Sequence, residues 1–200
     1  MIFTRDQENK KILIDNKYLN FQTMMEWEKP YMEFLVDNLK PHGHVLEIGY
    51  GLGYSFNRIQ KHDISSHTLI ECDQTVIDSI NNKNVEIIKG YWQDVFNQLD
   101  KYDCIFFDDA PNEKYSKKNR FDEFLMKILK HVKYDTRLTW YCDQFDTDFS
   151  NYPAEVNLKK FNIKVPKNCK YTEATDYMLA PVLSFKHIDP SKICVIEHNE

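Results

Sequence analysis

The run VLEIGYGLG, residues 45–53, constrains the fold of this chain more than any other segment. An apolar stretch leads into three glycines at alternate positions, and a helix-like pattern follows. Glycine lets the backbone turn tightly and lets a ligand approach the peptide group without meeting a Cβ atom. The spacing G-x-G-x-G differs from the G-x-G-x-x-G of dinucleotide-binding proteins. The run therefore predicts a strand, a tight turn and a helix, with a small-molecule site at the turn.

Short apolar runs alternate with amphipathic stretches along the rest of the chain. This alternation is typical of a buried parallel sheet with helical crossovers, and so predicts a doubly wound α/β fold. Two late runs without a helix between them predict a closing antiparallel hairpin. Strands are expected at 44–48, 67–72, 84–89, 103–108, 137–142, 161–165 and 177–185, and helices at 53–62, 74–82, 91–99 and 119–132. The sheet is therefore expected to be mostly parallel and seven-stranded, with helices on both faces.

The segment before the glycine run predicts a further helix. Apolar residues recur at three- and four-residue steps over 21–39, with Pro30 expected to kink the helix or to start a second piece. No linker rich in Gly, Pro and Ser interrupts the sequence, so one domain is expected over 1–200, with 1–20 as an N-terminal arm or partial lid.

Composition excludes several classes of function. The net charge of −5 gives no field that would attract nucleic acid. No apolar run approaches the roughly 18 residues that span a bilayer, and the polar N-terminal stretch lacks a secretory signal, so no membrane association and a cytoplasmic location are expected. The five cysteines and seven histidines show no ligand spacing, so we expect reduced thiols and no metal. The sequence does not predict the oligomeric state.

Two further loops complete a predicted nucleoside site. Glu71 ends the second strand about twenty residues after the glycines, where a carboxylate can accept the hydroxyls of a ribose. The third strand leads into GYWQD, residues 90–94, where an aromatic ring can stack on adenine and a polar side chain can reach its amine. With the E-x-G-x-G-x-G start, these loops resemble those of class I S-adenosylmethionine-dependent methyltransferases.

The fourth strand ends in FFDDAP, residues 106–111, which places Asp108 at the reacting end of such a site. A guanidine has a pKa of about 12.5 to 13.8, so it must lose a proton before its nitrogen can act as a nucleophile. A desolvated carboxylate can accept that proton, and a second carboxylate can hold the guanidinium by paired hydrogen bonds.

Six motifs in order carry a closer resemblance. They are WEKPYM (27–32), VLEIGYG (45–51), LIECD (69–73), KGYWQDV (89–95), FFDDAP (106–111) and CKYTEATDYMLAPV (169–182). Over residues 21 to 186 the chain closely resembles the guanidinoacetate N-methyltransferase family. The resemblance implies that Glu28 and Asp108 grip the guanidino group and that Asp108 accepts the proton. It implies S-adenosyl-L-methionine contacts from Met24, Met25, Met32, Gly49, Tyr50, Gly51, Leu52, Gly53, Tyr54, Ser55, Glu71, Cys72, Asp73, Trp92, Gln93 and Asp108, and substrate contacts from Gln144 and Phe145 beside Glu28 and Asp108.

Two departures from the family bear on the substrate. The family has a longer N-terminal segment with a tryptophan over the site, for which Tyr18 or Phe3 is the candidate replacement here. Asp109 and the three residues after it stand where the family has Thr-Tyr-Pro-Leu. An added acid at this point either raises the pKa of Asp108 by repulsion or favours a more cationic substrate.

The sequence thus predicts an N-methyltransferase for a small guanidino compound such as guanidinoacetate. Three alternatives stay open: a methyltransferase for another cationic nitrogen (arginine, an amine or a protein side chain), an inactive nucleoside-binding module, and an aminopropyl transferase of related fold.

Overall fold

The computed structural model describes residues 1–17, 21–82, 84–112, 114–115, 120–142, 149–169 and 176–188. Its main strands are β4 (Gly43–Ile48), β5 (Ile64–Glu71), β6 (Glu86–Lys89), β7 (Tyr102–Phe107), β8 (Val132–Trp140), β9 (Glu155–Asn162) and β10 (Tyr177–Ser184). Across the described residues they form a seven-stranded sheet in the order β6-β5-β4-β7-β8-β10-β9. The strands from β6 to β8 pair in parallel, and β10 pairs antiparallel with β8 and β9. The predicted α/β fold with a closing hairpin is confirmed.

The strand order reverses at β4. From β4 the chain moves through β5 to β6 on one side and then returns to β7 on the other side. The loops that leave β4 and β7 therefore diverge and open a crevice, which is where open parallel sheets bind ligands. The two loops touch at their base, because the Asp108 N–H donates to the Ile48 carbonyl at 3.0 Å.

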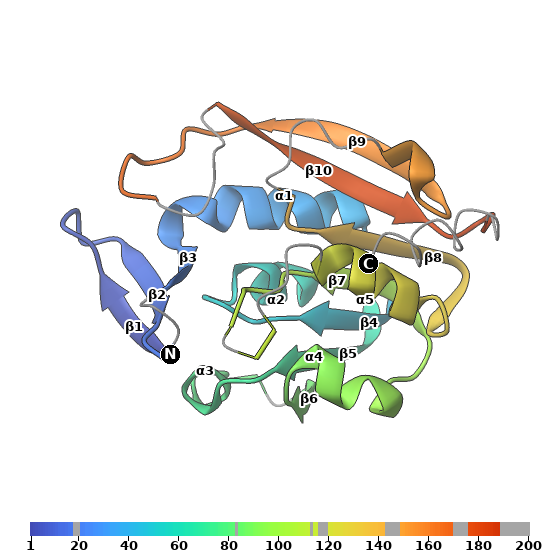
Figure 1. The fold of residues 1–200 in the computed structure, drawn as a ribbon, viewed down its shortest axis with the longest axis horizontal. Helices are drawn as coiled ribbons and strands as arrows, with labels where there is room; N and C mark the ends of the chain where they lie inside the picture. Colours follow the sequence, from blue (N-terminus) through green and yellow to red (C-terminus); the bar gives the residue numbers. More distant parts are fainter. Residues whose placement is uncertain are drawn as a thin grey trace.

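Helices cover both faces of the sheet (Figure 1). One core cluster joins α1 and α2 to the strand residues Val45 and Leu69, and the other joins α4 and α5 to Leu46 and Ile70. Successive strand residues point to opposite faces, so the apolar strands supply both clusters. The helices are α1 (Lys29–Leu39), α2 (Tyr54–Ile59), α3 (Gln74–Asp78), α4 (Trp92–Val95) and α5 (Arg120–Ile128), with 3-10 turns η1 (Glu26–Glu28), η2 (Phe96–Gln98) and η3 (Phe149–Asn151).

A second, three-stranded sheet precedes α1. Its antiparallel strands are β1 (Ile2–Arg5), β2 (Lys11–Asp15) and β3 (Phe21–Met25), in that order (Figure 1). The expected helix over 21–39 is therefore wrong for 21–25, where the backbone pairs with β2 instead. Pro30 stands in the first turn of α1, the one helical position that tolerates its missing N–H. The expected N-terminal arm contains β1 and β2, while Tyr18 lies outside the described residues.

Two strands begin well before the residue expected for them. β8 begins at Val132 rather than 137, because an irregularity in its pairing with β7 interrupts the alternation of side chains. Asp135, with φ of 70°, lies within that irregularity. β9 covers 155–162 rather than 161–165, since most of its side chains are exposed and give little apolar signal.

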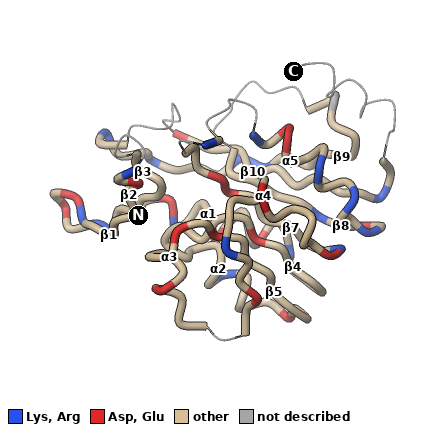
Figure 2. Tube along the Cα trace, turned by 60° about the horizontal axis from the view of Figure 1, so that its bottom comes forward, with Lys and Arg blue, Asp and Glu red and all other residues tan. Residues whose placement is uncertain are grey.

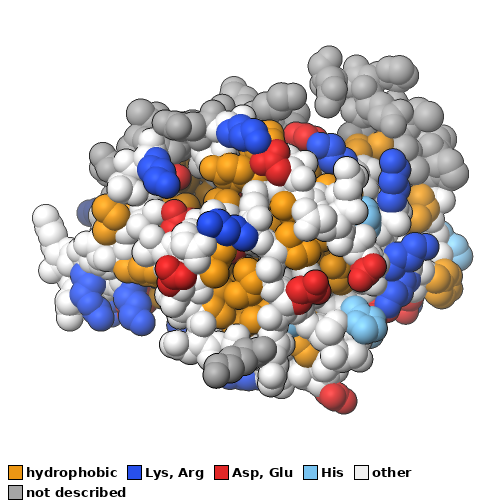
Figure 3. All heavy atoms as spheres, turned by 90° about the horizontal axis from the view of Figure 1, so that it is seen from below, with side chains coloured by type: hydrophobic (Ala, Val, Ile, Leu, Met, Phe, Trp, Pro, Cys, Tyr) orange, Lys and Arg blue, Asp and Glu red, His pale blue; other side chains and the backbone are white. Residues whose placement is uncertain are grey.

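Charges of both signs lie on the surface. Figure 2 shows Lys and Arg along β8 and β9, and Asp and Glu along the segments around α1, α3 and α4. The face in Figure 3 mixes acidic, basic and hydrophobic side chains. Among the described residues, no helix is both long and apolar enough to span a membrane.

Candidate active site

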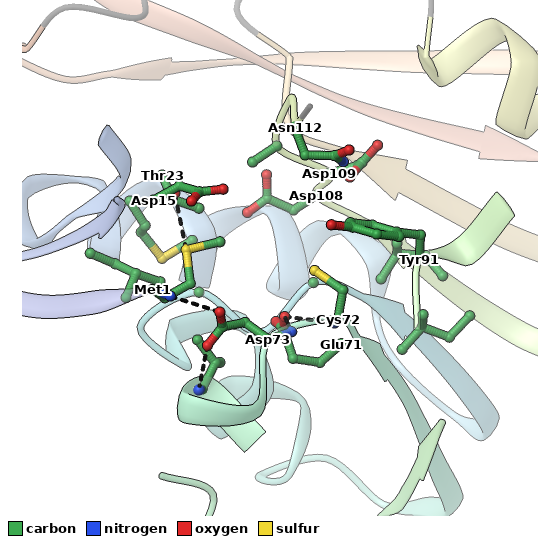
Figure 4. A pocket seen from close by; sticks show the side chains of 18 of the residues that line it. Met1, Asp15, Thr23, Glu71, Cys72, Asp73, Tyr91, Asp108, Asp109 and Asn112 are labelled. Carbon is green, nitrogen blue, oxygen red and sulfur yellow. Dashed lines mark hydrogen bonds and ion pairs between the residues drawn. The ribbon is translucent and has the colours of Figure 1, made fainter. Parts of the chain in front are cut away.

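A pocket lies in the crevice at the carboxyl ends of the strands (Figure 4). The glycine turn after β4, the ends of β5 and β6 and the loop after β7 form its floor and one wall. Residues of β2 and β3, among them Asp15, Thr23 and Met24, line it from the small sheet. The N-terminal sheet therefore forms part of the site, and no periodicity in the sequence predicted that contribution.

Gly49 brings the glycine turn into direct contact with the β7 loop. It has φ of 82°, and its N–H donates to the Ile70 carbonyl at 2.9 Å. A Cβ atom at this position would collide with the backbone carbonyl oxygen of Asp108. Glycine is therefore required here both by its backbone conformation and by the close approach of Asp108.

Glu71 ties the end of β5 to the glycine turn. Its Oε2 accepts the Tyr50 N–H at 3.0 Å, and its Oε1 accepts the N–H groups of Cys72 and Asp73 at 2.8 and 2.9 Å. Burial raises the pKa of Glu71, and the three backbone donors oppose that effect. The Cys72 side chain also hydrogen-bonds this carboxylate, so a ligand hydroxyl would share the Glu71 oxygens with four donors.

Trp92 and Tyr91 both line the pocket, but they differ in exposure. Trp92 is 2% exposed, packs edge-on against Phe107 and Phe124, and donates its indole N–H to Asp109 Oδ2 at 3.0 Å. Tyr91 is only partly buried and points toward the pocket near Cys72 (Figure 4). Tyr91 is therefore the more accessible ring for stacking, and its adjacency to Trp92 was the signal that could have identified it.

Asp108 is the carboxylate with the strongest electrostatic perturbation at the site. Its pKa is raised well above the usual range by burial and by the negative charges of Glu28, Asp109 and Glu47, with Arg120 opposing. Glu28 contributes the largest of these charge effects. The sequence-predicted pair of carboxylates therefore comes together closely enough for one to shift the titration of the other.

Glu28 itself is buried. It is 1% exposed, and its Oε2 accepts the Met25 N–H at 2.6 Å. It does not line the pocket.

Asp109 is bound by two neighbouring side chains. Arg120 places Nε 3.1 Å from Asp109 Oδ2, the oxygen that also accepts from Trp92. Asp109 is therefore fixed by its neighbouring side chains, and its charge still contributes to the raised pKa of Asp108. Of the two effects expected of an acid at position 109, repulsion between its charge and that of Asp108 is the one seen in the structure.

The other sequence-predicted residues differ in whether they line the pocket. The pocket is lined by Met24, Gly49, Gly51, Glu71, Cys72, Asp73, Trp92 and Asp108. The residues that do not line it are Met25, Met32, Tyr50, Leu52, Gly53, Tyr54, Ser55 and Gln93. Gln144 and Phe145 lie outside the described residues. Burial raises the pKa of the Cys72 thiol to about 12, so this pocket cysteine is not activated as a nucleophile. Within the described ranges, no group of three or more metal-ligating side chains is found.

The residues present fit a nucleoside cofactor with a sulfonium group. Gly49 and Gly51 of the turn line the pocket, the Glu71 carboxylate lines it at the end of β5, and the acidic residues Asp108 and Asp109 line it at the reacting end. The strand order and these strand-end groups define a class I S-adenosylmethionine-dependent methyltransferase. The family model of guanidinoacetate N-methyltransferase matches residues 9–152, and the chain belongs to that family.

Three curated relatives bear the name protein arginine N-methyltransferase 2. The protein of Candida glabrata is 34% identical over 104 residues, covering 46% of this chain and 25% of its own length. That of Kluyveromyces lactis is 25% identical over 175 residues, covering 72% and 42%, and that of Saccharomyces cerevisiae is 30% identical over 105 residues, covering 46% and 26%. The chain thus spans less than half the length of each of these relatives.

Solved structures share the fold at low identity. Spermidine synthase from Thermotoga maritima has a TM-score of 0.62 at 16% identity, covering 96% of this chain and 75% of that one. An O-methyltransferase from Bacillus cereus in complex with SAH has a TM-score of 0.53 at 17% identity, covering 78% and 80%.

Proposed function

We propose that the protein transfers the methyl group of S-adenosylmethionine to a nitrogen of a small guanidino compound, guanidinoacetate or a close relative. The observation that carries this proposal is that Asp108 lines the pocket with a raised pKa, to which Glu28 makes the largest charge contribution. A neutral acceptor would gain little from two such carboxylates, whereas a guanidinium is attracted to both.

Asp108 is proposed as the proton acceptor. A carboxylate with an ordinary pKa is a poor base toward a guanidinium, because the two pKa values differ by about eight units or more. Burial and the charge of Glu28 narrow that difference at Asp108. Proton removal by a positioned group contributes about 10²- to 10⁴-fold to a rate. Glu28 does not line the pocket, but it adds negative charge that favours a cationic acceptor.

The cofactor is proposed to lie between the glycine turn and Tyr91. Glu71 would hold its ribose and Tyr91 its adenine, with Asp73 at the rim of the pocket. When bound, S-adenosylmethionine supplies an electrophilic methyl group on a sulfonium. The residues of this chain orient the acceptor nitrogen, exclude water and take the proton.

A second candidate acceptor is the guanidino group of arginine, free or in a protein. The observation that favours it is the similarity to proteins named arginine N-methyltransferase 2, over a minor part of their length. The same carboxylates serve both acceptors, so substrate assays separate them.

The test is a product assay with methyl-labelled S-adenosylmethionine. The acceptors are guanidinoacetate, free arginine, an arginine-containing peptide, glycine and putrescine, with Asp108→Asn as the inactive control. We expect labelled product from guanidinoacetate. Transfer to arginine or the peptide alone would move the proposal to the second candidate, and transfer to no guanidine would overturn it.

Two further measurements address the remaining alternatives. Calorimetry that shows cofactor binding without turnover on any acceptor would indicate an inactive nucleoside-binding module. A preference for decarboxylated S-adenosylmethionine with putrescine would indicate aminopropyl transfer.

A further inference from the structure

Glu47 and His67 form a fully buried contact beneath the glycine turn. Glu47 lies in β4 two residues before Gly49, and His67 lies in the neighbouring strand β5. His67 Nε2 is 2.9 Å from Glu47 Oε2, and both side chains are 0% exposed. His67 has no part in the proton transfer described above, and Glu47 enters it only through its charge.

The orientation of His67 is fixed on its other side. Gln60 Nε2 lies 2.7 Å from His67 Nδ1, and Gln60 Oε1 accepts from Asn82 Nδ2 at 3.0 Å. An amide nitrogen can only donate, so Nδ1 accepts and the ring proton is on Nε2, facing Glu47. The ring also stacks on Phe56 with centroids 4.9 Å apart.

The Glu47 carboxylate contacts His67 but lacks well-aligned hydrogen-bond donors among the described residues. A buried carboxylate in this condition is costly, and its charge is poorly screened. Such a group at a functional site requires an explanation.

The charge of Glu47 acts on Asp108 from the neighbouring strand. Glu47 pairs in register with Phe106 of β7. Asp108 follows Phe106 by two residues and so lies on the same side of the chain. The charged groups that act on Asp108 are Glu28 from η1, Asp109 from its own loop, Glu47 from β4 and Arg120 from α5.

We propose that Glu47 and His67 are positioning residues for proton transfer at Asp108. His67 holds the Glu47 carboxylate under the glycine turn, and the negative charge of Glu47 keeps Asp108 basic enough to accept a proton from a cationic substrate. The role assigned to Asp108 rests on the proposed function. The effect of Glu47 on Asp108 does not depend on turnover and can be measured without it.

The test is a carbon-13 NMR titration of the Asp108 carboxyl group in the full chain, with Asp108→Asn used to assign the signal. Glu47→Gln preserves shape and removes the charge, so the Asp108 midpoint should fall by about one pH unit. His67→Phe keeps the stacking on Phe56 but removes the donor, which should shift the midpoint in the same direction because His67 then no longer holds the Glu47 carboxylate under the glycine turn. His67→Gln retains an N–H donor and should shift it less.

The matched control is Glu86→Gln, which removes an exposed carboxylate from the same sheet and should leave the midpoint unchanged. In wild type and Glu47→Gln, the acidic limb of kcat/KM should follow the NMR midpoint to lower pH. An unmoved Asp108 midpoint in both Glu47→Gln and His67→Phe, with only a lower unfolding temperature, would reduce the pair to a structural role and overturn the inference. Absence of methyl transfer in the wild-type protein with a normal NMR response would instead count against the proposed function.

Discussion

Arg120 holds Asp109 from the first residue of α5. Its Nε lies 3.1 Å from Asp109 Oδ2, and its Nη2 donates to the Asp109 carbonyl at 2.8 Å. Asp108, the neighbour of Asp109, therefore lies close to one positive charge among several negative ones. Arg120 both fixes the β7 loop and limits how far the pKa of Asp108 is raised.

Replacement of Arg120 by Met should separate these two effects. Loss of the positive charge should raise the pKa of Asp108 further, so the acidic limb of the pH–activity profile should move to higher pH. Loss of a partner for the largely buried Asp109 should cost about 1 to 3 kcal/mol in free energy of unfolding. Lys114→Met is the control for stability, since its pair with Asp94 is exposed and screened by solvent. A shift to lower pH would contradict the prediction.

Asp108→Asn should abolish turnover and spare cofactor binding. The amide keeps the shape of the side chain but cannot accept the proton, so kcat should fall by about 10²- to 10⁴-fold. The affinity for S-adenosylhomocysteine, measured by calorimetry, should stay within about tenfold of wild type. Loss of cofactor affinity as large as the loss of kcat would mean that Asp108 serves the nucleoside instead.

The centre of the sheet could be predicted from sequence because its strands are buried on both faces. The runs around Val45, Leu69 and Phe106 are rich in apolar residues, and glycines mark the turn after the first of them. Asp108 and Glu71 could be predicted for the same reason, since each directly follows or ends such a run and all these ends meet at one edge.

The contribution of the small sheet could not be predicted in this way. Asp15 and Thr23 come from strands of only five residues, and their place at the pocket depends on long-range packing. The contacts from Arg120 to Asp109 and from His67 to Glu47 join residues that are 11 and 20 positions apart. No local pattern indicates such pairs, because the fold alone brings them together.

Glu71→Gln should weaken cofactor binding. The carboxylate accepts three backbone N–H groups, and an amide NH₂ in place of one oxygen would face at least one of these donors. We expect the affinity for S-adenosylmethionine to fall by about 1 to 3 kcal/mol, measured by calorimetry. Glu86→Gln, at an exposed position on the neighbouring strand, is the control. An affinity equal to that of the control would remove Glu71 from the cofactor site.

Gly49→Ala should be more damaging than Gly51→Ala. Both glycines have positive φ values, 82° and 57°, so the backbone strain of about 1 to 2 kcal/mol is common to both variants. The new Cβ at Gly51 would lie 2.6 Å from Met24 Cε, the flexible end of a side chain that can rotate away. The new Cβ at Gly49 would meet the Asp108 carbonyl oxygen, a backbone atom that can move only with the β7 loop. We therefore expect Gly49→Ala to lose at least about 2 kcal/mol more in free energy of unfolding, measured by urea denaturation, and to lose kcat through displacement of Asp108. Equal losses in the two variants would show that strain alone, rather than contact with Asp108, requires glycine at position 49.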